Sequence, residues 1–396
     1  MAGIPQPSAR RASLAVIFGI VFIDLVGFGI VIPILPLYSQ RFGASPVVIG
    51  CLLSAYSLMQ ALCAPGWGRL SDRIGRRPVL FISLLGSAAG FWLMGIAHSL
   101  PLLFAARIID GITGGNISTA QAYIADITPP EQRSRGMGLI GAAFGLGFIF
   151  GPAIGGLLSQ VSPAAPFFFA AALAALNALA VALFLPESLV ASVPVERPRS
   201  VGLWDLVRVP TAKRLRIVMV LYGCTTMAFS LLTATYPLFT HARFGYGMKA
   251  IGYIFAAQGI VGAIIQGGLL GVLLHWGGDR RLVRLGLLLL GASLFVLPLT
   301  ATPAMLLAAT AGIAVGHSFV AAPLNGMASK AVDAASQGRV LGLMQSAASL
   351  ARIVGPVLGG WLLHYGAPAG GGLDARLAYW TAGALLIGGL GLSAGL

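Results

Sequence analysis

Two segments of the chain follow the same pattern. Residues 135–158 read RGMGLIGAAFGLGFIFGPAIGGLL, and residues 339–362 read RVLGLMQSAASLARIVGPVLGGWL. One constant offset aligns the arginine that opens each segment and the GPxxGG motif near its end. Similarity at a fixed offset indicates a repeated structural unit. The chain is therefore expected to contain two related halves, with these segments in equivalent places.

The composition indicates that lipid surrounds most of the chain. Hydrophobic residues make up 57% of the 396 residues, charged residues 9%, and the mean hydropathy is +0.90. A soluble domain has about 25% charged residues, and an apolar run of about 20 residues crosses a bilayer as a helix. These values predict an all-α membrane protein with twelve transmembrane helices. The runs are 14–38, 47–67, 78–97, 101–124, 136–158, 165–186, 214–240, 249–275, 282–301, 303–328, 340–364 and 376–395.

A charged, Pro-containing stretch separates the sixth run from the seventh. It predicts a cytoplasmic linker at 187–213, between an N-terminal six-helix bundle (1–186) and a C-terminal six-helix bundle (214–396). Two such pseudo-symmetric halves around a site near the membrane midplane are the plan of secondary transporters.

The net charge of +14 is unevenly placed along the chain. Basic residues gather before the first run and in every second connection after it, whereas the other side receives Arg41, Arg243, Lys249 and Arg376. This asymmetry follows the positive-inside rule, which predicts that both termini are cytoplasmic. The charge therefore requires no nucleic-acid partner.

The connection between the second and third runs reads GRLSDRIGRR over residues 68–77. It resembles the cytoplasmic signature loop of the major facilitator superfamily. The resemblance implies a conformational latch between the halves, formed by Gly68, Asp72, Arg73, Gly75, Arg76 and Arg77. The alternative, an ordinary positive-inside loop, explains the arginines but not the spacing of the glycines and the aspartate.

Three further segments resemble the drug/proton antiporter branch of that superfamily, which includes the tetracycline efflux pumps. They are FIDLVGFG at 22–29, RIIDGITGGN at 107–116 and GAAFGLGFIFGPAIGG at 141–156. The last is similar to the antiporter signature helix, with Gly147, Gly151, Pro152 and Gly155 as its characteristic residues; ordinary tight packing of small residues is the alternative. The tetracycline pumps carry an acidic residue where this chain has Gly90.

Ionisable side chains inside membrane spans are costly and are functional candidates by default. In or near the middle of the runs they are Asp24, Arg107, Asp110, His317 and Arg352. Asp24 is the preferred proton carrier, because burial favours a neutral carboxyl group and a neighbouring guanidinium favours the ionised one. Arg107, Asp110 and His317 complete the predicted proton-coupling set. The alternatives are a permanent ion pair of Arg107 with Asp24 or Asp110, and a structural role for His317.

On a straight helix, Arg107, Asp110, Ser118 and Gln121 share one face, whereas Asn116 points the opposite way and is expected to form an interhelical hydrogen bond. The predicted face can line a central cavity. The substrate-cavity candidates are Phe28, Ser118, Gln121, Phe144, Tyr236, Gln258, Gln345 and Arg352.

The resulting hypothesis is proton-coupled antiport, by alternating access, of a small amphipathic or cationic compound or drug out of a bacterial cell. The alternatives are a proton-coupled transporter of a metabolite such as a sugar or organic anion, and a non-transporting membrane receptor. No phosphate-binding loop or hydrolase motif occurs, so an enzyme is not expected. We expect a monomer in the inner membrane whose partners are substrate, protons and lipid. Only the proton gradient is needed, without cofactor or metal.

Overall fold

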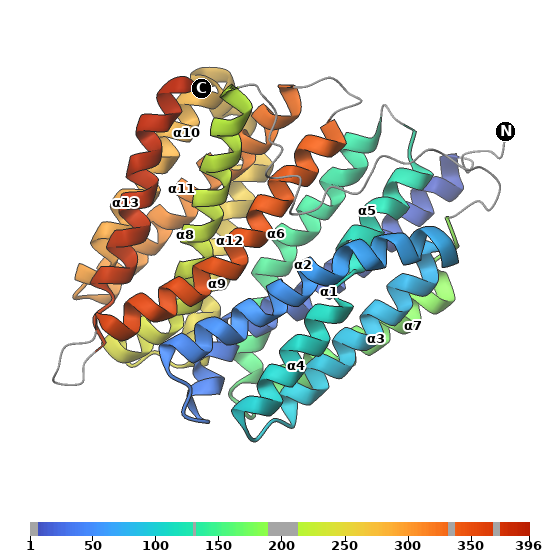
Figure 1. Ribbon diagram of the computed structural model, residues 1–396, viewed down its shortest axis with the longest axis horizontal. Coiled ribbons are helices and arrows are strands. Elements are labelled where there is room, and N and C mark those ends of the chain that lie inside the picture. The colour runs from blue at the N-terminus through green and yellow to red at the C-terminus, as the bar shows by residue number, and fades with distance from the viewer. Residues whose placement is uncertain (1–6, 130–131, 189–212, 332–336, 367–372) are drawn as a thin grey trace. The chain divides into compact units, whose positions relative to one another are not determined.

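The computed structural model describes residues 7–129, 132–188, 213–331, 337–366 and 373–396, in which helices are the regular elements and no strand occurs (Figure 1). The α-helices are α1 (Pro7–Gln40), α2 (Pro46–Ile74), α3 (Arg76–Gly95), α4 (Leu100–Thr113), α5 (Asn116–Ile127), α6 (Arg133–Leu158), α7 (Ala165–Phe184), α8 (Lys213–Phe244), α9 (Met248–Ile264), α10 (Leu270–Val296), α11 (Pro303–Lys330), α12 (Gln337–Tyr365) and α13 (Arg376–Leu392). A π-helical turn, η3 (Ile265–Leu269), joins α9 to α10, and Gly278 interrupts α10 with a φ of 70°. The predicted gap between the eighth and ninth runs therefore lies inside α10.

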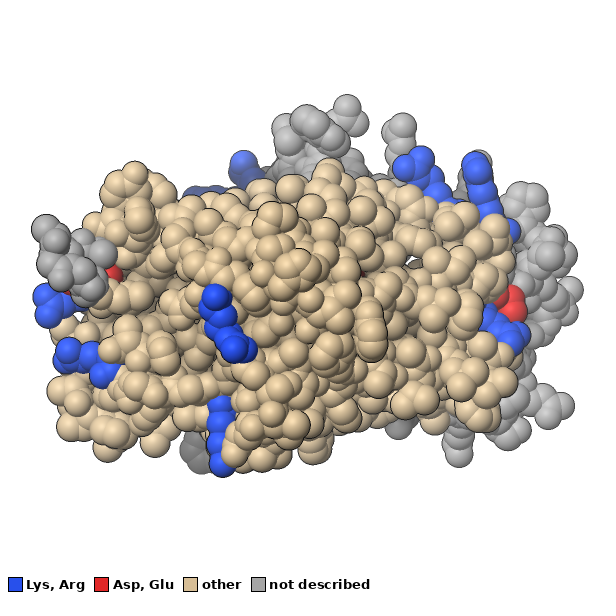
Figure 2. All heavy atoms as spheres, turned by 90° about the horizontal axis from the view of Figure 1, so that it is seen from below, with Lys and Arg blue, Asp and Glu red and all other residues tan. Residues whose placement is uncertain are grey.

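The predicted all-α membrane fold is confirmed. Among the described residues, ten helices are long and apolar enough to cross a bilayer. Large apolar side chains such as Leu62, Leu176 and Leu183 are more than half exposed on them. Figure 2 shows a face on which acidic and basic side chains are sparse. Such surfaces are stable against lipid and unfavourable in water.

Two predicted runs do not count among those ten helices. The last run forms α13, which has 17 residues. The fourth, expected to be one helix over 101–124, is divided into α4 and α5, so that prediction was wrong. The backbone leaves the helix at Gly114, with φ −69° and ψ 40°, and Gly115 then precedes α5. Glycine has little helix propensity, and two in succession favour such an interruption.

The helices pack as two compact units. One comprises Met1–Leu35 and Ala55–Ser200, and the other comprises Pro36–Ser54 and Val201–Leu396. The first part of α2 thus belongs to the second unit, where the Ser54 hydroxyl donates a hydrogen bond to the Ile353 carbonyl oxygen at 2.6 Å. Most of the predicted linker, residues 189–212, lies outside the described residues.

The repeated GPxxGG motif makes equivalent contacts in the two units. In the first unit α6 packs on α1, where a Cβ at Gly151 would lie 2.7 Å from the Cα of Gly29. In the second unit α12 packs on α8, where a Cβ at Gly355 would lie 2.8 Å from the Met227 carbonyl oxygen. Only glycine permits backbones to approach this closely. Equivalent motif positions therefore have the same packing role in each half.

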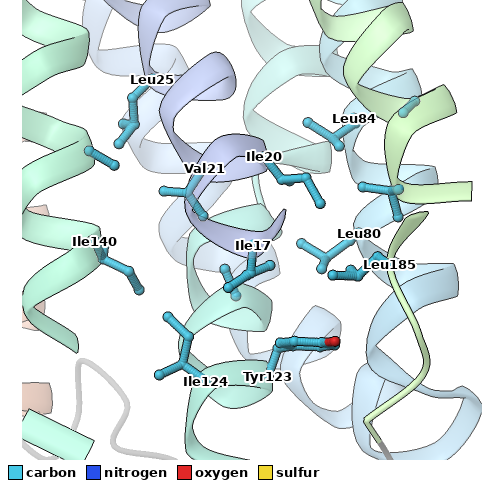
Figure 3. Close-up of a cluster of buried hydrophobic side chains, with 14 of the residues drawn as sticks. Ile17, Ile20, Val21, Leu25, Leu80, Leu84, Tyr123, Ile124, Ile140 and Leu185 are labelled. Carbon is cyan, nitrogen blue, oxygen red and sulfur yellow. The ribbon is translucent and has the colours of Figure 1, made fainter. Parts of the chain in front are cut away.

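The core of the first unit surrounds the first part of α1. In Figure 3, Ile17, Ile20 and Val21 of α1 lie among Leu80 and Leu84 of α3, Tyr123 and Ile124 of α5, Ile140 of α6 and Leu185 after α7. All of these side chains are buried. The next turns of α1, which carry Asp24 and Phe28, are positioned by this packing.

Candidate functional site

Asp24 of α1 is partly buried and is held by α5. Its Oδ2 accepts a hydrogen bond of 2.5 Å from the amide Nδ2 of Asn116, the first residue of that helix. The amide oxygen of Asn116 accepts a second bond from the backbone NH of Ile117. The expected interhelical hydrogen bond of Asn116 is confirmed. Asp24 is thus bound by a neutral amide and not by the guanidinium considered as its alternative partner.

Arg107 and Asp110 of α4 form a buried ion pair. Nη1 of Arg107 lies 3.1 Å from Oδ2 of Asp110, and both side chains are at most 4% exposed. The guanidinium also stacks over the ring of Tyr56, 4.5 Å from its centroid, and Ser87 of α3 bonds the Asp110 carboxylate. Cation–π contact and pairing offset part of the cost of desolvating Arg107, whose Nε is buried without a hydrogen-bond partner in the part of the chain that the structure describes. This is the pairing at i, i+3 that the sequence left open.

Aromatic rings extend from this pair toward α6. The ring of Phe28 lies 5.5 Å from that of Tyr56 and 6.3 Å from that of Phe148. Phe144 of α6 packs against the apolar core of the first unit instead. The first unit therefore combines a carboxylate, a paired guanidinium and an aromatic surface, an arrangement suited to amphipathic ligands.

Gly90 of α3 lies directly against Asp110. A Cβ at Gly90 would be 2.8 Å from the Cβ of Asp110 and 3.2 Å from the carbonyl oxygen of Ala106. The position at which the resemblance implies an acid is therefore bordered here by Asp110 of the neighbouring helix. The difference in sequence does not remove the acidic group from this part of the unit.

The helix break changes the surroundings of the remaining cavity candidates on the fourth run. Ser118 donates a hydrogen bond to the Gly115 carbonyl oxygen in its own first turn, at 3.0 Å, and Gln121 is exposed. A straight helix was the basis for placing both on one face with Arg107 and Asp110. That basis does not hold, because α4 and α5 are separate segments.

In the second unit, His317 of α11 stacks on Phe229 of α8, with ring centroids 4.3 Å apart. Tyr236 is fully buried, and its hydroxyl shares a hydrogen bond of 2.8 Å with Thr310, so its contribution here is to packing. On α12, Nη2 of Arg352 donates to the Ser349 hydroxyl at 3.1 Å.

The other two cavity candidates in this unit are Gln258, which is partly buried, and Gln345, which is exposed. A cavity of about 220 Å³ in the same unit contains none of the predicted substrate residues. It is lined by Arg214, Leu215, Val218, Met327, Lys330 and Ala331.

The predicted loop at 68–77 is almost entirely helical. The helix α2 continues to Ile74 and α3 begins at Arg76, so Gly75 alone joins them, with a φ of 107°. A loop was predicted because basic residues and glycines follow the apolar run. They are instead the solvent-side turns of two long helices.

Arg76 is the centre of the interactions at this junction. It is 4% exposed, and its guanidinium lies 2.6 Å from Asp72 and 2.9 Å from Asp126 at the end of α5. It also donates to the Ser71 hydroxyl at 2.6 Å. Arg73, by contrast, is exposed, and Gly68 is partly buried. The implied latch residues therefore differ sharply in burial.

Glu187, which follows α7, caps the start of α3. Its two carboxylate oxygens accept hydrogen bonds from the backbone NH groups of Arg76 and Arg77, at 2.8 and 3.1 Å. Arg77 also donates to the Ala182 carbonyl oxygen. Free NH groups at a helix N-terminus attract anions. Sequence reasoning assigned no role to Glu187 or Asp126, although both are carboxylates beside predicted span ends.

The model of the Major Facilitator Superfamily matches residues 17–289 and 269–396. The chain belongs to this superfamily. It is 36% identical to the class C tetracycline resistance protein of Escherichia coli, over 87% of this chain and 88% of that protein. With the class E protein of the same organism the identity is 34%, covering 86% and 85%. With multidrug resistance protein 2 of Bacillus subtilis (strain 168) it is 28%, covering 97% and 95%.

Solved structures of transporters share the fold. The human organic anion transporter MFSD10 (TETRAN) is 26% identical with a TM-score of 0.71, covering 98% of this chain and 100% of that one. A bacterial homologue of the lysosomal transporter Spinster has a TM-score of 0.81 at 15% identity, covering 98% and 97%. The chain is thus a multi-pass membrane transporter and not an enzyme, and its predicted resemblance to the drug/proton antiporter branch is confirmed.

Proposed function

We propose that the protein exports an amphipathic or cationic drug from the bacterial cytoplasm in exchange for protons. The carrying observation is that Asp24, a carboxylate inside a span, is bonded to the neutral amide of Asn116 while Arg107 is paired with Asp110. A carboxylate without a fixed cationic partner can bind a proton or a cation in turn. The tetracycline and multidrug resistance relatives support a drug as the substrate.

The exchange follows from competition at Asp24. In the ionised form the carboxylate attracts a cationic drug that lies against the rings of Phe28 and Tyr56. Protonation from the outside neutralises the charge, and the drug is released there. The charge of Asp110 also acts on Asp24. A shift of Arg107 from one carboxylate toward the other would therefore favour ionised Asp24 and couple the two acids.

Alternating access would move the two halves around a central site, with the residues of 68–77 holding the cytoplasmic side in one state. We place both termini in the cytoplasm, following the distribution of basic residues. The functional unit is a monomer, and the proton gradient of the inner membrane supplies the energy.

The second candidate is export of an organic anion, and one observation favours it. Arg352 lies partly buried on α12, where a guanidinium can bind a carboxylate in bidentate geometry. The similarity to a human organic anion transporter also supports an anionic substrate. In this case Arg352, and not Asp24, would determine which ligands bind.

Proton release from purified protein in weakly buffered detergent tests these proposals. Tetracycline, a lipophilic cation such as tetraphenylphosphonium and an aromatic carboxylate are added separately. We expect release with the cation or tetracycline, its loss in Asp24→Asn, and its retention in Asp374→Asn, which removes an exposed carboxylate outside the spans. Unchanged release in Asp24→Asn would contradict antiport at this residue, and binding of the carboxylate alone, abolished by Arg352→Gln, would favour the second candidate.

A further inference from the structure

The short helix α5 has a polar contact to a different element at each end. At its first residue, Asn116 donates to Asp24 of α1. Near its last residue, Asp126 accepts a hydrogen bond of 2.9 Å from Arg76 of α3 and one of 3.2 Å from the Ser188 hydroxyl. Ten residues of helix separate the two side chains, which is about 15 Å at 1.5 Å per residue. One rigid segment thus contacts both the membrane carboxylate and the 68–77 junction.

The backbone does not carry helical hydrogen bonds directly from α4 into α5. The NH of Gly115 bonds the carbonyl oxygen of Thr113 at 2.7 Å and the hydroxyl of Ser83 at 3.1 Å. The same hydroxyl donates to the Thr113 carbonyl oxygen, and Gln60 donates to that of Gly114 at 3.2 Å. Side chains of α2 and α3 therefore satisfy the backbone groups at the break. Consequently α5 can shift relative to α4 without breaking either helix.

Along its middle, α5 is held by apolar packing. Tyr123 and Ile124 lie against Ile17 of α1 and Leu80 of α3 (Figure 3). Apolar contact is non-directional and permits small sliding movements. Hydrogen bonds are directional, so the contacts at the two ends of α5 fix its position along its axis.

We propose that α5 transmits the ionisation state of Asp24 to the 68–77 junction. An ionised carboxylate holds the Asn116 amide with a charge-assisted bond, and a neutral one holds it less strongly. When Asp24 becomes neutral, α5 is less restrained and Asp126 no longer holds Arg76 in place. The step rests on the proposed function, because it requires that Asp24 changes its protonation during transport.

Charged groups lie beside both ends of α5. Near Asp24, the charged neighbour is Asp110, which is ion-paired with Arg107. At the C-terminal end of α5, Arg76 forms ion pairs with both Asp126 and Asp72, and Asp72 belongs to α2. If Asp126 moves away, Arg76 retains the Asp72 carboxylate and remains charged, but it loses its ion pair with α5.

Ser71 provides a reporter of this change that requires no transport. It is fully buried beneath Arg76, with which it shares a hydrogen bond. In a background with Cys51, Cys63 and Cys224 changed to serine, Ser71→Cys places one thiol at the junction. The rate of its alkylation by N-ethylmaleimide, followed by mass spectrometry, measures opening of the contact around Arg76.

We expect Asp24→Asn to raise this alkylation rate about fivefold or more, the size of a typical coupling between sites. Asn116→Ala should abolish the difference made by Asp24→Asn, and Asp126→Asn should abolish it from the other end. Asn177→Ala is the matched control, because Asn177 of α7 donates a buried bond of 2.8 Å to the Ile20 carbonyl oxygen of α1 but does not belong to α5. The response to Asp24→Asn should persist in this control.

The proposal would be overturned if Asp24→Asn left the alkylation rate unchanged. It would also be overturned if Asp24→Asn still raised the rate in the Asn116→Ala and Asp126→Asn backgrounds. The alkylation and proton-release assays distinguish failure of this link from failure of the proposed antiport. If proton release depends on Asp24 but the rate at position 71 does not, the link through α5 fails and the antiport stands. If the rate responds but no ligand releases protons, the link stands without the antiport.

Discussion

Moving a carboxylate from α4 to α3 tests whether an aspartate at position 90 can replace Asp110 as the ion-pair partner of Arg107. The perturbation is Asp110→Gly, Gly90→Asp and the two together. Asp110→Gly leaves Arg107, which is 3% exposed, without its carboxylate at 3.1 Å. Loss of one partner of a buried ion pair costs about 3–5 kcal/mol, and glycine within a helix adds about 1 kcal/mol.

Gly90→Asp alone is also unfavourable. Its Cβ would lie 2.8 Å from the Cβ of Asp110, which is closer than side chains approach, and overpacking of this kind costs about 1–3 kcal/mol. The double variant removes that contact and returns a carboxylate to Arg107. We therefore expect the double variant to lose about 2 kcal/mol less unfolding free energy than the two single variants lose together. This difference is within the range of interaction energies measured for contacting residues.

The assay is unfolding by SDS titration in mixed micelles, followed by tryptophan fluorescence. Gly90→Asn combined with Asp110→Gly is the matched control, because it restores volume but no charge, and it should recover less stability. Additivity of Asp110→Gly and Gly90→Asp within about 0.5 kcal/mol would refute the reasoning. It would mean that a carboxylate on α3 cannot replace the one on α4.

Three further changes have defined expectations in the same unfolding assay. Gly151→Ala places a Cβ 2.7 Å from the backbone of α1 and should lower the unfolding free energy by about 1–3 kcal/mol. A Cβ at Gly145 meets nothing within 4 Å, so Gly145→Ala should change it by less than about 0.5 kcal/mol. Equal effects would contradict the close packing of α6 on α1. Glu187→Ala removes the carboxylate that accepts from the first two backbone NH groups of α3 and should cost about 1–2 kcal/mol, with Glu187→Gln milder; no loss would exclude a capping role. Tyr56→Phe keeps a ring over Arg107 while Tyr56→Leu does not, so the leucine variant should be less stable by about 1–2 kcal/mol, and equal stabilities would argue against the cation–π contact.

Local sequence was sufficient for the features that depend on helix length and on close backbone packing. Apolar runs predicted the helices, because a span needs about 20 apolar residues wherever it lies in the fold. The GPxxGG repeat predicted equivalent helices, and Gly151 and Gly355 make equivalent contacts in their units. Such glycines can be recognised in a sequence because close backbone approach depends only on the lack of a side chain at that position.

The features that were missed depend on partners far away in the chain. The apolar pattern continues through Gly114 and Gly115, and the break there is stabilised by Gln60 and Ser83 from other helices. Without knowledge of those partners, one straight helix was the simpler interpretation. Glu187 was missed for the same reason, since its capping contact lies 111 residues away, at Arg76.

The two units share a scaffold but differ in their chemistry, and this difference bears on how coupling arises. In the first unit, α1 of the glycine-packed pair carries Asp24, whose carboxylate is bonded to a neutral amide, and α4 carries Arg107 and Asp110. In the second unit, His317 stacks on a phenylalanine ring, and Arg352 bonds the Ser349 hydroxyl. A repeat that served packing alone would tolerate similar residues in both copies. Concentration of carboxylates in one copy is the pattern expected if the first unit handles the proton, so substitutions at Asp24 should alter coupling more than substitutions at Arg352.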